Sequence, residues 1–315
     1  MTAATSAGTA ATAADPYDPV AFRAGLVAHG FLIPTGVRGG DGHGATFEDL
    51  LERFDAAVLR EAADDGAEAM HFPPLVARTL IERMGYLGNF PQLIGSVHSF
   101  FGDDAGGREL AARADAGERW EHLLQPTETM LLPAACYPVY PLFSGLLPET
   151  GRLVTVRNWC YRHEPSDEPT RMQSFRQREL IRIGTPEAVQ AWRDDWLRRS
   201  LALLRRLGLP AQSDVANDPF FGRSGRMMAA SQRDQRLKFE VVVPVISAER
   251  PTAVCSLNWH QDHFTAVFGI HRAGGATAHT ACLGFGLERA TLALIKTHGF
   301  EPADWPAQVR AVLWP

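Results

Sequence analysis

The sequence is poor in the features that mark secreted, membrane-bound or nucleic-acid-binding proteins. Its four cysteines are widely spread over 315 residues and form no CxxC pair, a density that argues against a disulfide framework. No apolar run is long enough to cross a bilayer. The formal net charge of −5 gives no general reason to expect nucleic-acid binding. Residue types that specify chemistry must therefore be sought in local patterns.

The N-terminal segment lacks the signals of export. MTAATSAGTAATAAD is rich in Ala and Thr and has neither a basic region nor an apolar core. We expect a disordered tail over residues 1–15, one domain over residues 16–315 and a cytoplasmic protein.

The most informative stretch runs from Val154 to Gly184 and predicts two strands joined by the polar connector EPSDEPTRM. Arginines and isolated glutamates occupy positions where a buried hairpin would carry Val and Ile. Residues 152–206 hold twelve Arg and seven Asp or Glu, a local balance of 12 − 7 = +5. Taken alone, the stretch fits a local anion site and an exposed, salt-bridged hairpin equally well.

Periodicity and turn residues predict the surrounding elements. Helices are expected over residues 16–30, 47–63, 75–84 and 187–207. A strand runs into Pro73 and Pro74, which suits a sheet edge. The last third alternates strands and turns and changes from strand to helix around Gly284–Gly286. Strands and long helices without a βαβ rhythm indicate an α+β fold with a largely antiparallel sheet.

Two further patterns have an ordinary explanation and a sharper one. The glycine-rich segment VRGGDGHGA lacks the Lys-Ser/Thr ending of a phosphate loop, so we interpret it as a turn. On the helix over residues 187–207, Arg198 and Arg205 are seven apart, as are Arg199 and Arg206. A solvated face is the default interpretation of these arginines, and a docking surface for an acidic partner is the alternative.

Three motifs in order resemble those of class II aminoacyl-tRNA synthetases. HFPPLV resembles motif 1, YRHE followed by SFRQREL resembles motif 2, and GFGLER resembles motif 3. KFEVVVP and CSLNWHQDHF are similar to the stretch between motifs 2 and 3 of seryl-tRNA synthetases. The sustained heptads of their tRNA-binding arm are missing before residue 120. A synthetase-like core without that arm resembles the amino acid:[carrier protein] ligases.

The resemblance implies a class II synthetase-like antiparallel sheet flanked by helices, in a homodimer. It also implies an ATP-dependent, AMP-forming ligase that converts glycine or alanine to an aminoacyl-adenylate. The acceptor would be the phosphopantetheine thiol of an acidic carrier protein, steered by the basic helix, and not tRNA. Two alternatives are an armless aminoacyl-tRNA synthetase and a non-catalytic paralogue acting as a regulator, but the latter would be expected to lose motif residues that are present here.

The same resemblance assigns residues to ATP. Arg162 would hold the α-phosphate and the substrate carboxylate, and Arg289 would hold the outer phosphates and cover the adenine. Glu164 would accept from the adenine amino group. The nucleotide would be lined further by Arg171 and Met172.

Two details of the nucleotide site stay open. ATP brings Mg²⁺ to offset its charge, with Glu240 as a candidate ligand. The position after Glu179 is Leu180, where seryl enzymes carry Phe. Stacking on adenine is therefore weaker, or comes from Phe175, or the motif match is one register off.

A zinc site is implied by Cys136, Glu179 and Cys282, which resemble the Cys-Glu-Cys set of these ligases and of methanogen-type seryl-tRNA synthetases. Two thiolates and a carboxylate leave one tetrahedral position open, which the substrate amino group could fill. Without the resemblance, two buried cysteines and a salt-bridged glutamate would explain these residues.

The remaining cysteines and histidines match no ligand pattern. Cys160 and Cys255 are expected to be buried. His260 and His263 would point to opposite faces of a strand, so we assign them structural or pocket-lining roles.

Overall fold

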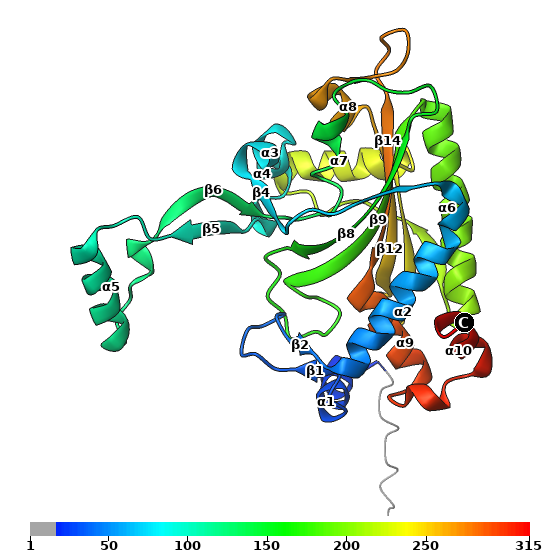
Figure 1. Ribbon diagram of the computed structural model, residues 1–315. Coiled ribbons are helices and arrows are strands. Elements are labelled where there is room, and N and C mark those ends of the chain that lie inside the picture. Colours follow the sequence, from blue (N-terminus) through cyan, green and yellow to red (C-terminus); the bar gives the residue numbers. More distant parts are fainter. Residues whose placement is uncertain (1–16) are drawn as a thin grey trace, which may run out of the picture.

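The computed structural model describes residues 17–315, so the tail predicted over residues 1–15 lies outside the described residues. A twisted seven-stranded sheet forms the centre (Figure 1), and its order is β10-β11-β12-β14-β9-β8-β3. In that order the strands are Gln212–Val215, Lys238–Val243, Thr252–Gln261, His279–Gly286, Ser174–Gly184, Arg152–Tyr161 and Glu68–Met70. All neighbours are antiparallel except β3 and β8. The α+β fold with a largely antiparallel sheet is confirmed.

Helices cover one face of this sheet with a large apolar core. Helices α2, α6 and α9 contact the sheet or one another, and α10 packs on α2 and α6. These helices are Ala45–Glu61, Pro186–Arg206, Leu287–His298 and Ala307–Leu313, and α1 spans Pro19–Ala28. The buried residues of α6 include Val189, Trp196 and Leu203, as the apolar stripe of its sequence predicts.

A smaller sheet extends from the body. Strands β4 (Leu75–Ala77), β6 (Gln125–Leu131) and β5 (Ser96–Ser99) form it in that order. Helix α5 (Asp104–Asp115) lies beyond them, well away from the main sheet (Figure 1), and buries none of its residues. Sequence patterns did not predict this arm.

The helix predicted over residues 75–84 is wrong at its start. Leu75–Ala77 are extended because they pair with β6 in an antiparallel ladder, and helix α3 begins at Arg78 and ends at Arg83. Gly85 follows with φ 67, the left-handed geometry of a helix stop. Strand β3 lies at the sheet edge, as Pro73 and Pro74 predicted.

Apart from α7, the remaining helices and strands are short. Helices α4, α7 and α8 span Tyr86–Asn89, Gly222–Asp234 and His263–Phe268, and strands β1, β2, β7 and β13 span Leu32–Ile33, Gly42–His43, Gly145–Leu146 and Ile270–His271. Within residues 17–315, no helix combines the length and the apolarity needed to cross a membrane.

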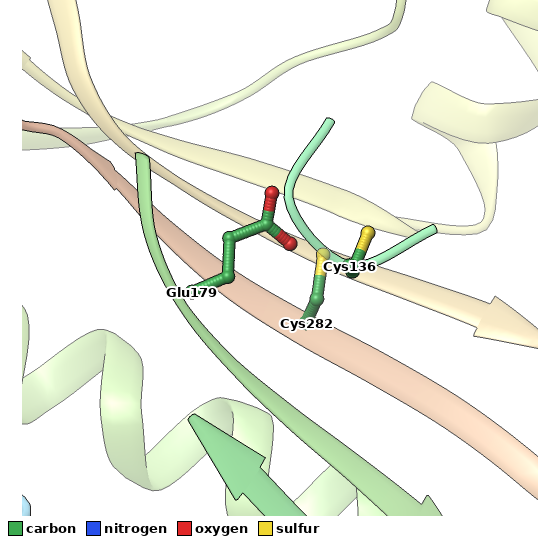
Figure 2. Close-up of side chains that lie close together, drawn as sticks. All are labelled: Cys136, Glu179 and Cys282. Atoms are coloured by element: carbon green, nitrogen blue, oxygen red, sulfur yellow. The ribbon is translucent and has the colours of Figure 1, made fainter. Parts of the chain in front are cut away.

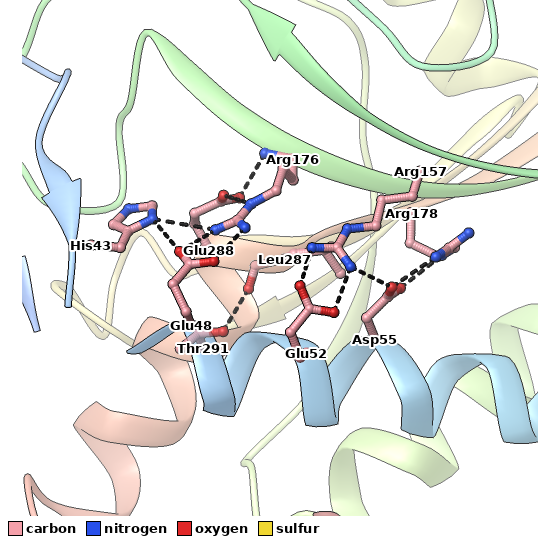
Figure 3. Close-up of polar contacts among 10 residues, drawn as sticks. All are labelled: His43, Glu48, Glu52, Asp55, Arg157, Arg176, Arg178, Leu287, Glu288 and Thr291. Carbon is pink, nitrogen blue, oxygen red and sulfur yellow. Dashed lines mark hydrogen bonds and ion pairs between the residues drawn. The ribbon is translucent and has the colours of Figure 1, made fainter. Parts of the chain in front are cut away.

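Ion pairs join helix α2 to the β8–β9 hairpin (Figure 3). Both oxygens of Asp55 accept from Arg178 at 2.7 Å, and both residues are buried. Arg157 donates to Asp55 at 3.2 Å and to Glu52. These two arginines therefore hold carboxylates of the protein itself, so the anion site suggested by the hairpin charge does not include them.

A second cluster ties the hairpin to helix α9 (Figure 3). The backbone N–H and Nε of Arg176 donate to Glu288, which has no exposed surface, at 2.7 Å each. The other guanidinium nitrogens donate to Glu48 of α2. Because Glu288 precedes Arg289, this cluster fixes the start of α9 against β9.

Candidate functional site

A cavity of about 620 Å³ opens on the sheet face opposite α2, α6 and α9. It brings together residues from strands β9, β11, β12 and β14, the β8–β9 connector and α7. Most of the predicted site residues line it, namely Cys136, Arg162, Glu164, Met172, Glu179, Glu240, Cys282 and Arg289. Arg171 does not line the cavity and lies half-exposed at its rim, 3.3 Å from Glu164.

The metal-ligand candidates converge at the buried end of the cavity (Figure 2). Cys136, Glu179 and Cys282 are all buried, and their ligand atoms lie within 4.8 Å of one another. Glu179 and Cys282 share one face of the sheet because β14 pairs Gly284 with Glu179. A Cβ at Gly284 would lie 3.3 Å from Glu179 Cγ, so the small residue leaves room for the carboxylate.

The donor set fits a borderline-soft dication such as zinc. Glu179 Oε1 accepts from the Ala135 N–H at 3.1 Å, whereas the buried Oε2 has no hydrogen-bond partner among the described residues. Burial raises the pKa of Glu179 to about 8. The hydrogen bond with Cys136 lowers the pKa of Cys282, and burial raises that of Cys136. An unpaired carboxylate oxygen facing two sulfurs is the kind of site that zinc satisfies.

Two side chains of β12 reach Cys282, and the sequence did not single them out as its partners. Asn258 Nδ2 and His260 Nε2 each lie 3.6 Å from its sulfur. His260 Nδ1 lies 3.0 Å from the Thr280 hydroxyl, which fixes the ring. Their i, i+2 spacing on a strand is a signal that could have identified them.

His260 and His263 do not lie on one strand, so the prediction that they point to opposite strand faces is wrong. Strand β12 ends at Gln261, which has φ 53, and His263 starts helix α8. The β12–β14 register shifts between Trp259 and Gln261, a bulge that leaves His260 unpaired. Both histidines line the cavity.

Arg162 and Arg289 are held by backbone carbonyls. Arg162 Nε donates to Pro133 O at 3.1 Å, and Arg289 Nε donates to Thr170 O at 2.8 Å. Burial and the nearby charge of Arg162 lower the pKa of Arg289. Neither guanidinium forms an ion pair within residues 17–315. Two cations held together in this way favour an anionic ligand between them.

Leu180 does not reach the cavity. It is fully buried in the core on the helix side of the sheet, because successive residues of β9 alternate and Glu179 takes the cavity side. Phe175 lines the cavity, and the Arg162 guanidinium lies 5.4 Å from its ring centre. Leu180 therefore cannot stack on a nucleotide in this cavity. Phe175, which lines the cavity, is positioned to do so.

A charged group on the opposite wall was missed from the sequence. Lys238 Nζ lies 2.7 Å from Asp218 and 3.1 Å from Glu240. Gln232 of α7 donates to Asp218 at 2.9 Å. Burial acts to raise the pKa of Asp218, but Lys238 brings it below its ordinary value. This group joins α7 to the cavity wall.

Comparison with curated proteins identifies the family. "Amino acid--[acyl-carrier-protein] ligase 1" of Bradyrhizobium diazoefficiens is 44% identical over 271 residues, covering 85% of this chain and 83% of the relative. Ligase 2 of the same organism is 44% identical over 300 residues, covering 95% and 88%. The chain belongs to the amino acid–[acyl-carrier-protein] ligase family. The prediction of an enzyme of this class is thus confirmed, although no protein-family model matches the sequence.

The ligase is also similar to seryl-tRNA synthetases. A type-2 serine–tRNA ligase of Methanopyrus kandleri is 30% identical over 291 residues, covering 84% of this chain and 54% of the relative. The structure of M. kandleri seryl-tRNA synthetase, solved with A. aeolicus tRNASec, aligns with a TM-score of 0.79 at 24% identity, covering 93% and 60%. That of the Pyrococcus horikoshii enzyme with ATP gives 0.68 at 14%, covering 96% and 64%. The class II synthetase-like fold is confirmed, and the ligase spans little more than half of these longer chains.

Proposed function

We propose that this ligase activates a small amino acid with ATP and transfers it to the phosphopantetheine thiol of a carrier protein. The observation that carries the proposal is the shared cavity, which the buried Cys136–Glu179–Cys282 cluster and the two half-buried arginines, Arg162 and Arg289, line together. One end can hold an amino group and the other a polyphosphate. Family membership supports both half-reactions.

Cys136, Glu179 and Cys282 would hold zinc, which supplies a Lewis acid for the amino group of the substrate. Arg162 is placed to orient the carboxylate toward the α-phosphate, because its guanidinium is fixed by Pro133 O and Phe175. The carboxylate oxygen attacks the α-phosphorus and pyrophosphate leaves. Arg162, together with Arg289, offsets the charge that develops, and Mg²⁺ would accompany ATP.

The remaining roles follow from the cavity walls. Glu164 and Met172 line the nucleotide end, with Phe175 beneath Arg162 as the stacking candidate. Glu240 shares Lys238 with Asp218 and is the proposed Mg²⁺ ligand. The carrier thiol then attacks the carbonyl carbon of the adenylate, forming a thioester and releasing AMP.

Crowding around the sulfurs favours glycine or alanine as the substrate. Asn258 and the fixed ring of His260 stand beside Cys282, and His260 packs against Phe264 at 4.7 Å between ring centres. These side chains would narrow the space beside a bound amino group and so disfavour a larger substrate side chain.

The carrier is proposed to dock on α7 instead of on the basic helix α6. Arg199 and Arg206 of α6 bond to Asp65 and Glu61, so their charge is largely engaged. Helix α7 has exposed arginines and two exposed methionines, and one of them, Met228, also lines the cavity. The exposed cations are Arg223, Arg226 and Arg233. Such a surface suits an acidic partner whose prosthetic arm must enter the cavity.

The acceptor is tested by supplying labelled glycine or alanine with holo-carrier protein and with bulk tRNA in parallel. Carrier loading is expected, and it should fall when Arg226 and Arg233 are replaced by Glu while pyrophosphate exchange into ATP is unchanged. Loading of tRNA alone would favour the armless synthetase. Absence of exchange with any small amino acid would favour a regulator.

The metal is tested by elemental analysis of the purified ligase. About one zinc per chain is expected from the single three-residue cluster found in residues 17–315. Cys282→Ala should lose zinc and amino-acid activation together. Cys160→Ala changes another buried free cysteine, outside the cluster, and should keep the metal. Full activity of the zinc-free protein would refute the site.

We also propose a homodimer. Strand β3 is an edge strand that runs into Pro73 and Pro74, and Leu75 beyond them is 44% exposed. Light scattering coupled to gel filtration should give twice the chain mass, and Leu75→Glu should shift it toward the monomer.

A further inference from the structure

The glycine-rich segment VRGGDGHGA spans residues 37–45, and its sequence predicts only a turn. Its first residues, together with Thr35 and Gly36, form the glycine-rich loop of residues 35–41, which lies against the β8–β9 connector of residues 162–173. The backbone N–H of Gln173 donates to Gly39 O at 2.7 Å. The Gln173 side-chain amide donates to Arg38 O at 2.7 Å. At the rim, Arg38 Nε pairs with Asp167 at 3.0 Å, where both side chains are exposed. One half-buried backbone hydrogen bond and one exposed side-chain hydrogen bond thus join segments more than 120 residues apart.

This glycine-rich loop has its own anchor on the body. Asp41 accepts from Arg23 of helix α1 through both oxygens, at 2.6 and 2.7 Å. The Thr35 hydroxyl closes the loop by donating to Gly40 O at 2.6 Å. Both contacts come from Arg23 Nη2, and this part-buried, charge-assisted pair attaches the loop to α1. The loop therefore links α1 to the β8–β9 connector that it contacts.

Gln173, the residue that the loop contacts, is bonded to the part of the connector that lines the cavity. Gln173 O accepts from the backbone N–H of Arg162 at 2.9 Å, and Met172 beside it lines the cavity. On the other side of the connector, Thr170 O accepts from Arg289. The connector is thus held from two directions, by the glycine-rich loop at Gln173 and by helix α9 at Thr170.

Gly39 is required by the closeness of this contact. Its φ is +71, and a Cβ would lie 3.2 Å from Gln173 N and 3.3 Å from Arg171 O. Both are backbone atoms, so the connector itself would have to move. Gly36 in the same loop has φ +87 but nothing within 4 Å of its Cβ position. Substitution of either glycine by alanine would strain a left-handed backbone conformation. Only at Gly39 would the added Cβ also press against the connector.

We propose that the glycine-rich loop is a brace that fixes the connector, with Gly39 as a positioning residue for the Arg162 and Met172 side of the nucleotide site. The inference rests on the proposed function only in naming ATP as the ligand. The brace itself is a property of the free protein. It makes the connector ordered before the nucleotide arrives, which lowers the entropy lost on binding.

The test compares Gly39→Ala with Gly36→Ala. Amide hydrogen exchange over residues 162–173 of the free protein is expected to quicken at least tenfold in Gly39→Ala and to stay within twofold of wild type in Gly36→Ala. In amino-acid-dependent pyrophosphate exchange, Gly39→Ala should raise the KM for ATP roughly tenfold, since misplacement by about an ångström costs up to ~100-fold. The KM for the amino acid should rise less than the KM for ATP, because Arg162 also holds the amino-acid carboxylate whereas the Cys136–Glu179–Cys282 cluster lies outside the connector.

Asp41→Asn provides a second perturbation that leaves both glycines intact. It weakens the bond to Arg23 and should quicken exchange over the same connector. Unchanged exchange in both Gly39→Ala and Asp41→Asn, or equal effects of the two glycine substitutions, would overturn the brace. If exchange is faster in Gly39→Ala but the wild-type protein shows no ATP-dependent activity, the proposed function is refuted and the brace stands.

Discussion

Replacing Asp55 with Ala should destabilise the ligase by about 3–5 kcal/mol, the usual cost of leaving a buried charge without its partner. Asp55 and Arg178 have 5% and 8% exposed side-chain surface. Once the carboxylate is removed, Arg178 keeps one side-chain contact, with the Thr155 hydroxyl at 3.4 Å. Arg157 keeps Glu52, so the loss falls on Arg178.

The measurement is a thermal unfolding curve. An unfolding entropy of roughly 2.1 cal/mol/K per residue gives about 0.66 kcal/mol/K for the 315 residues. The expected loss therefore corresponds to a decrease in Tm of roughly 5 to 8 °C. Asp49→Ala is the matched control, because Asp49 pairs with Arg53 on the exposed side of the same helix. It should cost no more than about 0.5 kcal/mol.

A double variant tests whether the cost comes from the unpaired Arg178 charge or from the loss of packing at this buried position. Asp55→Leu combined with Arg178→Met replaces two opposed charges by apolar groups, and such exchanges are often neutral. The double variant should recover most of the stability lost by Asp55→Ala. Equal effects of Asp49→Ala and Asp55→Ala, or no recovery in the double variant, would refute the assignment of the cost to an uncompensated Arg178.

Three other outcomes are expected. The hydrogen bond from Arg176 lowers the pKa of Glu48 below 4.5. The ionised Glu48 carboxylate therefore stabilises the fold above pH 4.5, and this stabilisation is lost as the pH falls through the lowered pKa. Glu48→Gln should flatten the pH dependence of the urea midpoint below pH 4.5. Gly284→Ala, whose Cβ would crowd the metal-facing carboxylate, should weaken zinc binding roughly tenfold, whereas Gly286→Ala, with its nearest atoms at 3.7 Å, should not; chelator competition measures both. His260→Leu should weaken zinc binding by ~10–100-fold, and equal affinities of variant and wild type would contradict its role beside Cys282.

Local sequence predicted the elements whose signals are themselves local. The change from strand to helix after Gly286 occurs as expected, because a glycine pair interrupts one period and starts another. The buried stripe of α6 was likewise predicted from the spacing of apolar residues such as Val189 and Trp196.

What failed depended on partners distant in the chain. Two of the four α6 arginines, Arg199 and Arg206, have partners in Asp65 and Glu61, which lie more than 130 residues away in the sequence. Leu75–Ala77 satisfied a helical period but found a strand partner in β6. Within the site, the family resemblance supplied the three metal-ligand candidates. The spacing of Asn258 and His260 places them on one face of a strand, but the pairing of that strand with β14, which brings them to Cys282, is not visible in the sequence.

The register of β14 has a consequence for how a correctly folded ligase could be recognised. The strand pairs Cys282 with Asn258 on one side and Gly284 with Glu179 on the other. A slip of one residue against either neighbour would turn Cys282 to the opposite face and present Leu283 in its place. The same slip would expose apolar core residues. A chain that gathers the three ligand atoms must therefore have formed its central strand pairing correctly, so at the proposed metal site the metal content would measure the correctly folded fraction.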